Sequence, residues 1–346
     1  MSGELNLTYS GHFAPRADGR YVCTMAAHMA MLRDRTPELA LPRDLTAECF
    51  AEWQANIKAA LAKQLRMPAA TAQPAPVQLS CVQRDGYRVE KWEFYPDDYT
   101  VVPFLVLVPD GISTAPAVLC YLGDADSKEA FAGEPALSHP NCVSDCAPLG
   151  QQFVRDGMVV FVFDTPGFGE CSVMADPALG QTQQYIREIL CHGLLETGMG
   201  YIGLTVFQRL QFMQWLDQFT FVDQANVAIY GCGLGTEAAI ATGVLHDGLK
   251  GLVLQQLLQD DRVRYESGTE QPGRIMTQDV GKWHILPGKM TMFGWQDLCA
   301  AFAPRYLGIC EGDVHPTVER AYGTKTAQGD AGNLLKACFE GGVQHV

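Results

Sequence analysis

The residues best suited to nucleophilic chemistry lie between positions 226 and 245. The apolar run 227–230 is followed by five residues with glycine at Gly231, Gly233 and Gly235, and then by residues typical of a helix. This pattern predicts a buried strand, a sharp turn and a helix. Enzymes that attack a carbonyl carbon can carry their nucleophile in such a turn, with a small residue two positions away on each side. With Gly231 and Gly235 as the small residues, the central position is Gly233, which carries no nucleophile.

Several interpretations of this turn stay open from the sequence. Glycine adopts strained backbone conformations at little steric cost, so Gly233 is typical of an elbow that has lost its nucleophile. Alternatively, Cys232 does the chemistry one position earlier, between the bulky Tyr230 and Leu234, or it only packs behind the turn. A dinucleotide-binding turn would need glycine where Thr236 stands. The last alternative is a plain structural turn.

The elements that must position this turn begin with a helical extension over residues 1–75. Apolar residues recur at helical spacing from residue 45, which predicts an amphipathic helix capped by Asp44 or Thr46. The Pro- and Ala-rich residues 68–76 end this helix. We therefore divide the chain into an N-terminal helical extension, 1–75, and an α/β domain, 76–346.

The α/β domain is predicted to contain a mixed, mostly parallel sheet flanked by helices. Alternating residues predict antiparallel strands first, and short continuous apolar runs then predict parallel strands buried on both faces. The expected strands are 77–83, 87–95, 101–108, 117–122, 158–163, 227–230, 249–254 and 336–340, and residues 303–316 are expected to form a strand and a loop. The expected helices are 144–156, a broken segment over 185–217, and one from about residue 317. The polar segment 260–286 could cover the site.

Composition restricts the function classes. The 346-residue chain has 47% hydrophobic residues and a net charge of −14, which argues against nucleic acid and anionic membranes as partners. No apolar window approaches the roughly 18 residues of a membrane span. No signal peptide is visible at the start, so we expect a cytoplasmic protein. Homo-oligomer formation stays open.

The twelve cysteines favour a reducing compartment and argue against a disulfide framework. Cys120, Cys310 and Cys338 fall inside expected buried strands, where a free cysteine behaves as a small hydrophobe. The closest pair, Cys142 and Cys146, has no matching pair at a zinc-site spacing. We therefore expect no metal and no cofactor.

The order of these parts resembles the α/β-hydrolase fold, and more closely the acetyl xylan esterase-like branch related to dienelactone hydrolases. The resemblance covers roughly residues 45–346. The segments that carry it are 85–87, 89–91, 164–170, 231–235, 286–288, 297–298, 303–305 and 339–342. It implies a carboxylic ester hydrolase scaffold with the chain order nucleophile, acid, histidine.

The resemblance also assigns roles to residues of this chain. The nucleophile position is Gly233, and the histidine position is matched by His345, after the expected last strand and a Gly-Gly turn. In the acid position the family commonly has Asp immediately before proline, where this chain has His315, and Asp313 lies two residues earlier. The backbone of Leu234, and of Gly123 and Asp124 in the loop after strand 117–122, would form the oxyanion hole.

These residues lead to three competing functions. The first is a pseudoenzyme that binds a small ester or acyl ligand and is catalytically impaired because of Gly233. The second is an active ester hydrolase that uses Cys232 with His345 or His315 as base. The third is a ligand-binding protein without catalysis, whose pocket lies beside the glycine-rich loop 164–172. The residues expected to line that pocket are Phe168, Leu234, Trp283 and Trp295.

Overall fold

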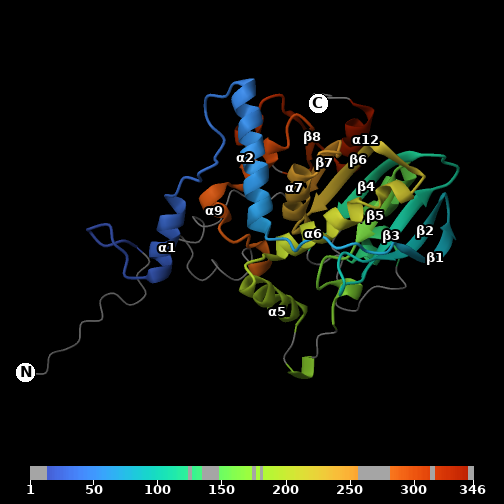
Figure 1. Ribbon diagram of the computed structural model, residues 1–346, viewed down its shortest axis with the longest axis horizontal. Helices are drawn as coiled ribbons and strands as arrows, with labels where there is room; N and C mark the ends of the chain where they lie inside the picture. Colours follow the sequence, from blue (N-terminus) through green and yellow to red (C-terminus); the bar gives the residue numbers. More distant parts are fainter. Residues whose placement is uncertain are drawn as a thin grey trace, which may run out of the picture.

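One nine-stranded sheet organises the molecule, with strand order β1-β2-β3-β5-β4-β6-β7-β8-β9. The computed structural model describes residues 14–123, 127–134, 148–173, 177–179, 182–255, 281–311 and 316–341. Figure 1 shows the strands running across the molecule from β1 at one end towards β8. Because most of these strands are buried on both faces, the sheet is the core of the protein.

The strands are antiparallel at one edge of the sheet and parallel elsewhere. They are β1 Val77–Arg84, β2 Tyr87–Phe94, β3 Val102–Pro109, β4 Ala115–Tyr121, β5 Val159–Phe163, β6 Val222–Cys232, β7 Gly251–Gln255, β8 Tyr306–Ile309 and β9 Lys325–Gln328. β1, β2, β3 and β5 pair antiparallel in that order. β5, β4, β6, β7, β8 and β9 pair parallel. The predicted mixed, mostly parallel sheet is confirmed.

Helices cover both faces of the sheet. They are α1 Thr24–Arg33, α2 Ala47–Leu65, α3 Lys128–Ala132, α4 Leu149–Arg155, α5 Gln183–Glu196, α6 Tyr201–Met213, α7 Gly235–Leu245, α9 Lys289–Met292, α10 Trp295–Ala301, α11 Pro316–Glu319 and α12 Ala331–Glu340, with short 3-10 turns η2 Gly169–Cys171, η3 Pro177–Leu179, η4 Leu216–Gln218 and η5 Lys282–His284. Side chains of α2, α6, α7 and α10 form one core cluster with the sheet. Side chains of α3, α4 and α12 form the other.

The helical extension packs directly on the α/β domain. Thr46 caps α2, as expected, because its side chain accepts a hydrogen bond from the backbone N–H of Cys49. One face of α2 is buried, including Trp53, Ile57 and Leu61, and belongs to the same core cluster as the sheet. The periodicity that predicted this amphipathic helix therefore also identified its buried face.

The end of the chain differs from the sequence-based expectation. Residues 336–340 were expected to be a strand, but they form the last half of α12. The Gly-Gly turn begins with Gly341, which ends α12 in the left-handed conformation (φ 73°) that glycine adopts most easily. The last strand within the described residues is instead β9, a short, half-exposed edge strand that the hydrophobic pattern did not reveal. Cys338 therefore lies on a helix, and His345 follows a helix.

Within the part of the chain that the structure describes, no single helix is long and apolar enough to cross a membrane. The segments Tyr185–Glu196 and Tyr201–Gln218 pass that test of length and composition only as a pair, and the pair is bent by 86°.

Candidate functional site

The turn between β6 and α7 has the geometry of a strand–helix elbow. Gly233 has a positive φ of 51°, a conformation that L side chains adopt only with strain. Its N–H donates to the carbonyl of Gln255 at the end of β7, over 3.2 Å, and its carbonyl accepts from Thr236 N over 3.1 Å. The chain therefore reverses sharply at Gly233 and enters α7 at once.

The two flanking glycines allow the strand and the helix to approach closely. A Cβ atom on Gly231 would lie 2.8 Å from Ala239 Cβ. A Cβ atom on Gly235 would lie 2.1 Å from the carbonyl oxygen of Tyr121, at the end of β4. No side chain fits at either position without movement of the backbone. Gly231 and Gly235 are therefore the small residues that the elbow pattern predicted, with Gly233 between them.

Cys232 does not share the environment of the elbow. Its side chain is only 2% exposed and belongs to the core cluster on the α3, α4 and α12 face, together with Tyr230 and Phe153. Leu234, two residues later, belongs to a separate cluster with Tyr201 and Trp283. The chain thus places Cys232 in the core behind the elbow and Leu234 in front of it.

Aromatic side chains and an arginine form a wall beside Leu234. The guanidinium carbon of Arg187, on α5, lies 3.7 Å from the centre of the Phe168 ring and 4.5 Å from that of Trp283. Arg187 thus joins Phe168 to Trp283, and Trp283 belongs to the cluster that contains Leu234; that these side chains line a pocket stays a prediction. Trp295 does not join them, because it packs in the core of the sheet with Lys289 Nζ 4.2 Å from its ring centre.

A carboxylate–histidine pair joins η5 to the first turn of α7. His284 Nδ1, from η5, is 2.9 Å from Glu237 Oε2, in the first turn of α7. Their side chains are 12% and 1% exposed. The sequence analysis missed this pair because its members are 47 residues apart and only the tertiary fold brings them together. On its own, a glutamate in the first turn of a helix indicates only a favourable interaction between its charge and the helix dipole.

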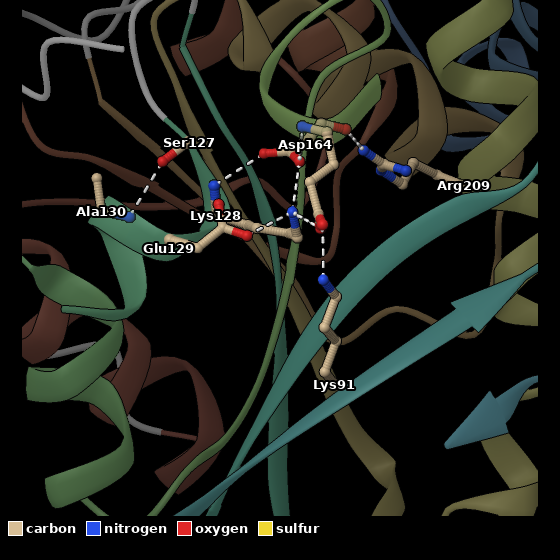
Figure 2. A network of polar contacts seen from close by, with 8 residues as sticks. Lys91, Ser127, Lys128, Glu129, Ala130, Asp164 and Arg209 are labelled. Carbon is tan, nitrogen blue, oxygen red and sulfur yellow. Dashed lines mark hydrogen bonds and ion pairs between the residues drawn. The ribbon is translucent and has the colours of Figure 1, made fainter. Parts of the chain in front are cut away.

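A second polar centre lies at the carboxyl ends of β4 and β5. Lys128, at the start of α3, is fully buried, and its Nζ atom lies 2.6 Å from an oxygen of each of three carboxylates, Glu129, Asp164 and Glu170. Lys91 of β2 contacts the other oxygen of Glu170, also at 2.6 Å. Figure 2 shows these side chains converging from β2, α3 and the loop that follows β5.

Burial and charge act in opposite directions in this network. Burial alone would lower the pKa of Lys128, but the charges of Asp164 and Glu129 outweigh it and raise the pKa above its usual value. Burial raises the pKa of Glu129, against the opposing effect of Lys128. For Glu170, hydrogen bonds from Lys128 and Lys91 outweigh burial and lower the pKa. Lys128 therefore acts as the positively charged counter-ion of these carboxylates inside the protein.

The three carboxylates have the spacing of a cation site. Their ligand atoms lie within 4.8 Å of one another, which suits a divalent metal. However, Lys128 Nζ stands among them and supplies the positive charge. Asp164 also accepts from the backbone N–H groups of Lys128 and Glu170. The network thus ties the loop after β5 to the start of α3.

Not every predicted site residue falls in the described structure. Asp124, Asp313, His315 and His345 lie outside the described residues. Gly123 lies two residues after the end of β4, and its carbonyl accepts from Thr165 Oγ1 at 3.4 Å. Leu234 is the N-cap residue of α7, and its role in an oxyanion hole stays a prediction.

Comparison with known proteins agrees with this geometry. Residues 7–330 match the model of the Abhydrolase family. The structure is similar to that of a putative acetyl xylan esterase from Bacteroides fragilis, with a TM-score of 0.81 and 31% sequence identity over 91% of this chain and 83% of the other. It also resembles a glucuronoyl esterase from Solibacter usitatus in fold, with a TM-score of 0.54 and 14% identity over 88% and 97% of the two chains. A search among curated proteins gives no match.

The fold and the elbow therefore define an α/β-hydrolase of the esterase-like branch. The chain belongs to the Abhydrolase family.

Proposed function

We propose that this protein binds a small ester or acyl ligand at the elbow and is catalytically impaired, because Gly233 occupies the position of the nucleophile. The observation that carries the proposal is the elbow itself. Gly233 has a φ of 51° between two glycines that leave no room for a Cβ atom, in a chain of esterase-like ancestry. This backbone geometry around a residue without a side chain supports an elbow that has lost its nucleophile.

The expected degree of impairment follows from studies of catalytic triads. Removing any member of a triad leaves about 10³- to 10⁴-fold catalysis over water, from binding and the oxyanion hole. The N-terminus of α7 still directs its backbone N–H groups towards the elbow, where they would stabilise a negative oxygen. A bound ester would therefore be polarised but not attacked by a side chain.

The main alternative is an active hydrolase in which Cys232 has replaced the missing nucleophile. Its burial argues against this role, since a thiolate must reach the ester carbonyl. A binding protein without any turnover is the second alternative, and the wall of Phe168, Leu234 and Trp283 would serve it equally well.

The experiment is turnover of 4-nitrophenyl acetate by the wild type, Cys232→Ala and His345→Ala, beside a buffer blank. We expect equal, slow rates for the three proteins, and no acetylated protein by mass spectrometry. Loss of turnover in both variants would identify Cys232 as a displaced nucleophile and refute the proposal. A further variant, Gly233→Ser, should become labelled by a fluorophosphonate probe, whereas wild type and Gly233→Ala should not.

A further inference from the structure

We propose that His284 and Glu237 form a water-activating catalytic pair beside the elbow, which hydrolyses small carboxylic esters slowly without an acyl-enzyme. This inference rests on the proposed function, because it needs the ester to bind at Gly233. It goes beyond that function by assigning the residual chemistry to two residues that belong to none of the triad positions.

The first argument is the geometry of the pair. His284 Nδ1 lies 2.9 Å from Glu237 Oε2, so the carboxylate accepts the Nδ1 proton and fixes the orientation and tautomer of the ring. The side chain of Glu237 is 1% exposed and that of His284 is 12% exposed, so solvent reaches the pair only at the histidine. Among the described residues, His284 Nε2 has no hydrogen-bond partner. This nitrogen is therefore available as a proton acceptor.

The second argument is the position of the pair relative to the elbow. Glu237 lies three residues after Leu234, so both side chains lie on the same face of α7. Leu234 belongs to one cluster with Trp283, the residue immediately before His284. The pair thus lies on the Leu234 side of α7, and the N–H of Leu234 is the expected oxyanion donor.

The third argument is the missing side chain at position 233. The hydroxymethyl group that a serine would carry there is about the size of a water molecule, whose share of liquid volume is roughly 30 Å³. A water in that place would stand where the nucleophile of an active hydrolase stands. Among the described residues, the turn after β9 consists of Gly329 and Asp330, so it contains no histidine that could take a proton from this water. The side chain of Asp330 caps α12.

The reaction that this arrangement supports is general-base hydrolysis. The water oxygen attacks the ester carbonyl carbon, while His284 Nε2 takes one water proton and the carbonyl oxygen becomes negative. The tetrahedral intermediate then collapses, the bond between the carbonyl carbon and the alcohol oxygen breaks, and His284 returns the proton to the departing alcohol. The products are a carboxylic acid and an alcohol. Glu237 acts as a positioning residue.

The test compares kcat/KM for 4-nitrophenyl acetate in the wild type, His284→Gln, Glu237→Gln and His192→Gln. A glutamine at 284 can still donate to Glu237, so it preserves the contact while removing the base. We expect a loss of 10²- to 10⁴-fold for His284→Gln, the usual contribution of a general base. We expect a loss of about 10- to 100-fold for Glu237→Gln. His192, an exposed histidine that contacts Lys282 of η5, is the matched control and should leave the rate unchanged.

Further readouts separate catalysis from structure. Thermal unfolding should show that the variants are folded, and binding of 4-nitroacetanilide, measured by calorimetry, should be the same in wild type and His284→Gln. Equal rates in wild type and His284→Gln, or accumulation of acetylated wild-type protein, would overturn the catalytic pair. Binding without a His284-dependent rate would leave the proposed function intact and remove only this inference. Failure of the wild type to bind would remove both.

Discussion

Replacing Lys128 with alanine tests whether the buried network depends on a lysine counter-ion. The substitution removes the ammonium group that lies 2.6 Å from each of three carboxylates. It leaves Glu129, which is buried, without a neutralising charge among the described residues, and leaves Asp164 with only Arg209, which donates to the Asp164 carbonyl, while Glu170 keeps Lys91 as its partner. The remaining carboxylates must then repel one another, take up protons or draw in water.

The magnitude follows from the burial of these groups. At an effective dielectric constant of about 20, one ion pair at this separation is worth roughly 6 kcal/mol before desolvation is subtracted. Desolvation of the ions cancels most of that attraction, and breaking a buried pair by removing one partner costs about 3–5 kcal/mol. We therefore expect Lys128→Ala to lower the free energy of unfolding by about 3–5 kcal/mol. The exposed pair Lys58–Asp247 gives the matched control, and Lys58→Ala should cost about 0–1 kcal/mol.

Calcium provides a second readout of the same variant. The three carboxylate groups offer oxygens within 4.8 Å of one another, about twice the usual Ca²⁺–oxygen distance of roughly 2.4 Å. With the ammonium group removed, Ca²⁺ at 100 times its Kd should restore about 2.7 kcal/mol, and it should not stabilise the wild type through this site. Urea denaturation at neutral pH, with and without calcium chloride, measures both effects. An unfolding free energy within about 0.5 kcal/mol of wild type, the range of ordinary surface substitutions, would refute the counter-ion reasoning.

Three further predictions concern other parts of the fold. Gly235→Ala should cost at least about 1–3 kcal/mol, because its Cβ would lie 2.1 Å from the Tyr121 carbonyl, and a thermal unfolding temperature equal to wild type would contradict this. Thr46→Ala should cost about 1 kcal/mol through loss of the α2 cap, measured by urea denaturation, whereas Thr46→Ser should be nearly neutral. Glu170 has a lowered pKa in the folded protein, so its stabilising contribution is present above its ordinary pKa of 4.5 and is lost as the pH falls towards the folded value. The difference in unfolding free energy between wild type and Glu170→Gln should therefore shrink as the pH falls below 4.5; a constant difference would show that the charge is irrelevant.

Much of the fold could be predicted because hydrophobic periodicity records burial. The parallel strands β4, β5 and β7 are short apolar runs, and α2 shows its buried face in its spacing. The pattern failed at the end of the chain, where α12 presents four buried positions on one face, Ala331, Leu334, Leu335 and Cys338, while the adjacent strand β9 is largely polar. A strand at the edge of a sheet buries little, so it leaves little hydrophobic signal.

The candidate site was only partly predictable, for a different reason. The elbow is local in sequence, and glycine at alternate positions is sufficient to indicate it. The contacts of Lys128 with Asp164 and of His284 with Glu237 join residues far apart in the chain. Charged side chains are usually exposed, so nothing in the sequence around Lys128 indicates that it is buried. These pairs form only when the fold brings together segments that are distant in the sequence.

The close packing at the elbow also affects how related sequences should be compared. Gly231 is required by Ala239 and Gly235 by the carbonyl of Tyr121, and neither requirement depends on the residue at position 233. A descendant with serine at that position and one with glycine would be under the same steric selection at the two flanking positions. Two glycines that flank an elbow therefore indicate close packing of a strand on a helix and do not indicate catalytic activity. A change of a single codon at the central position could remove or restore the nucleophile without any change in this packing.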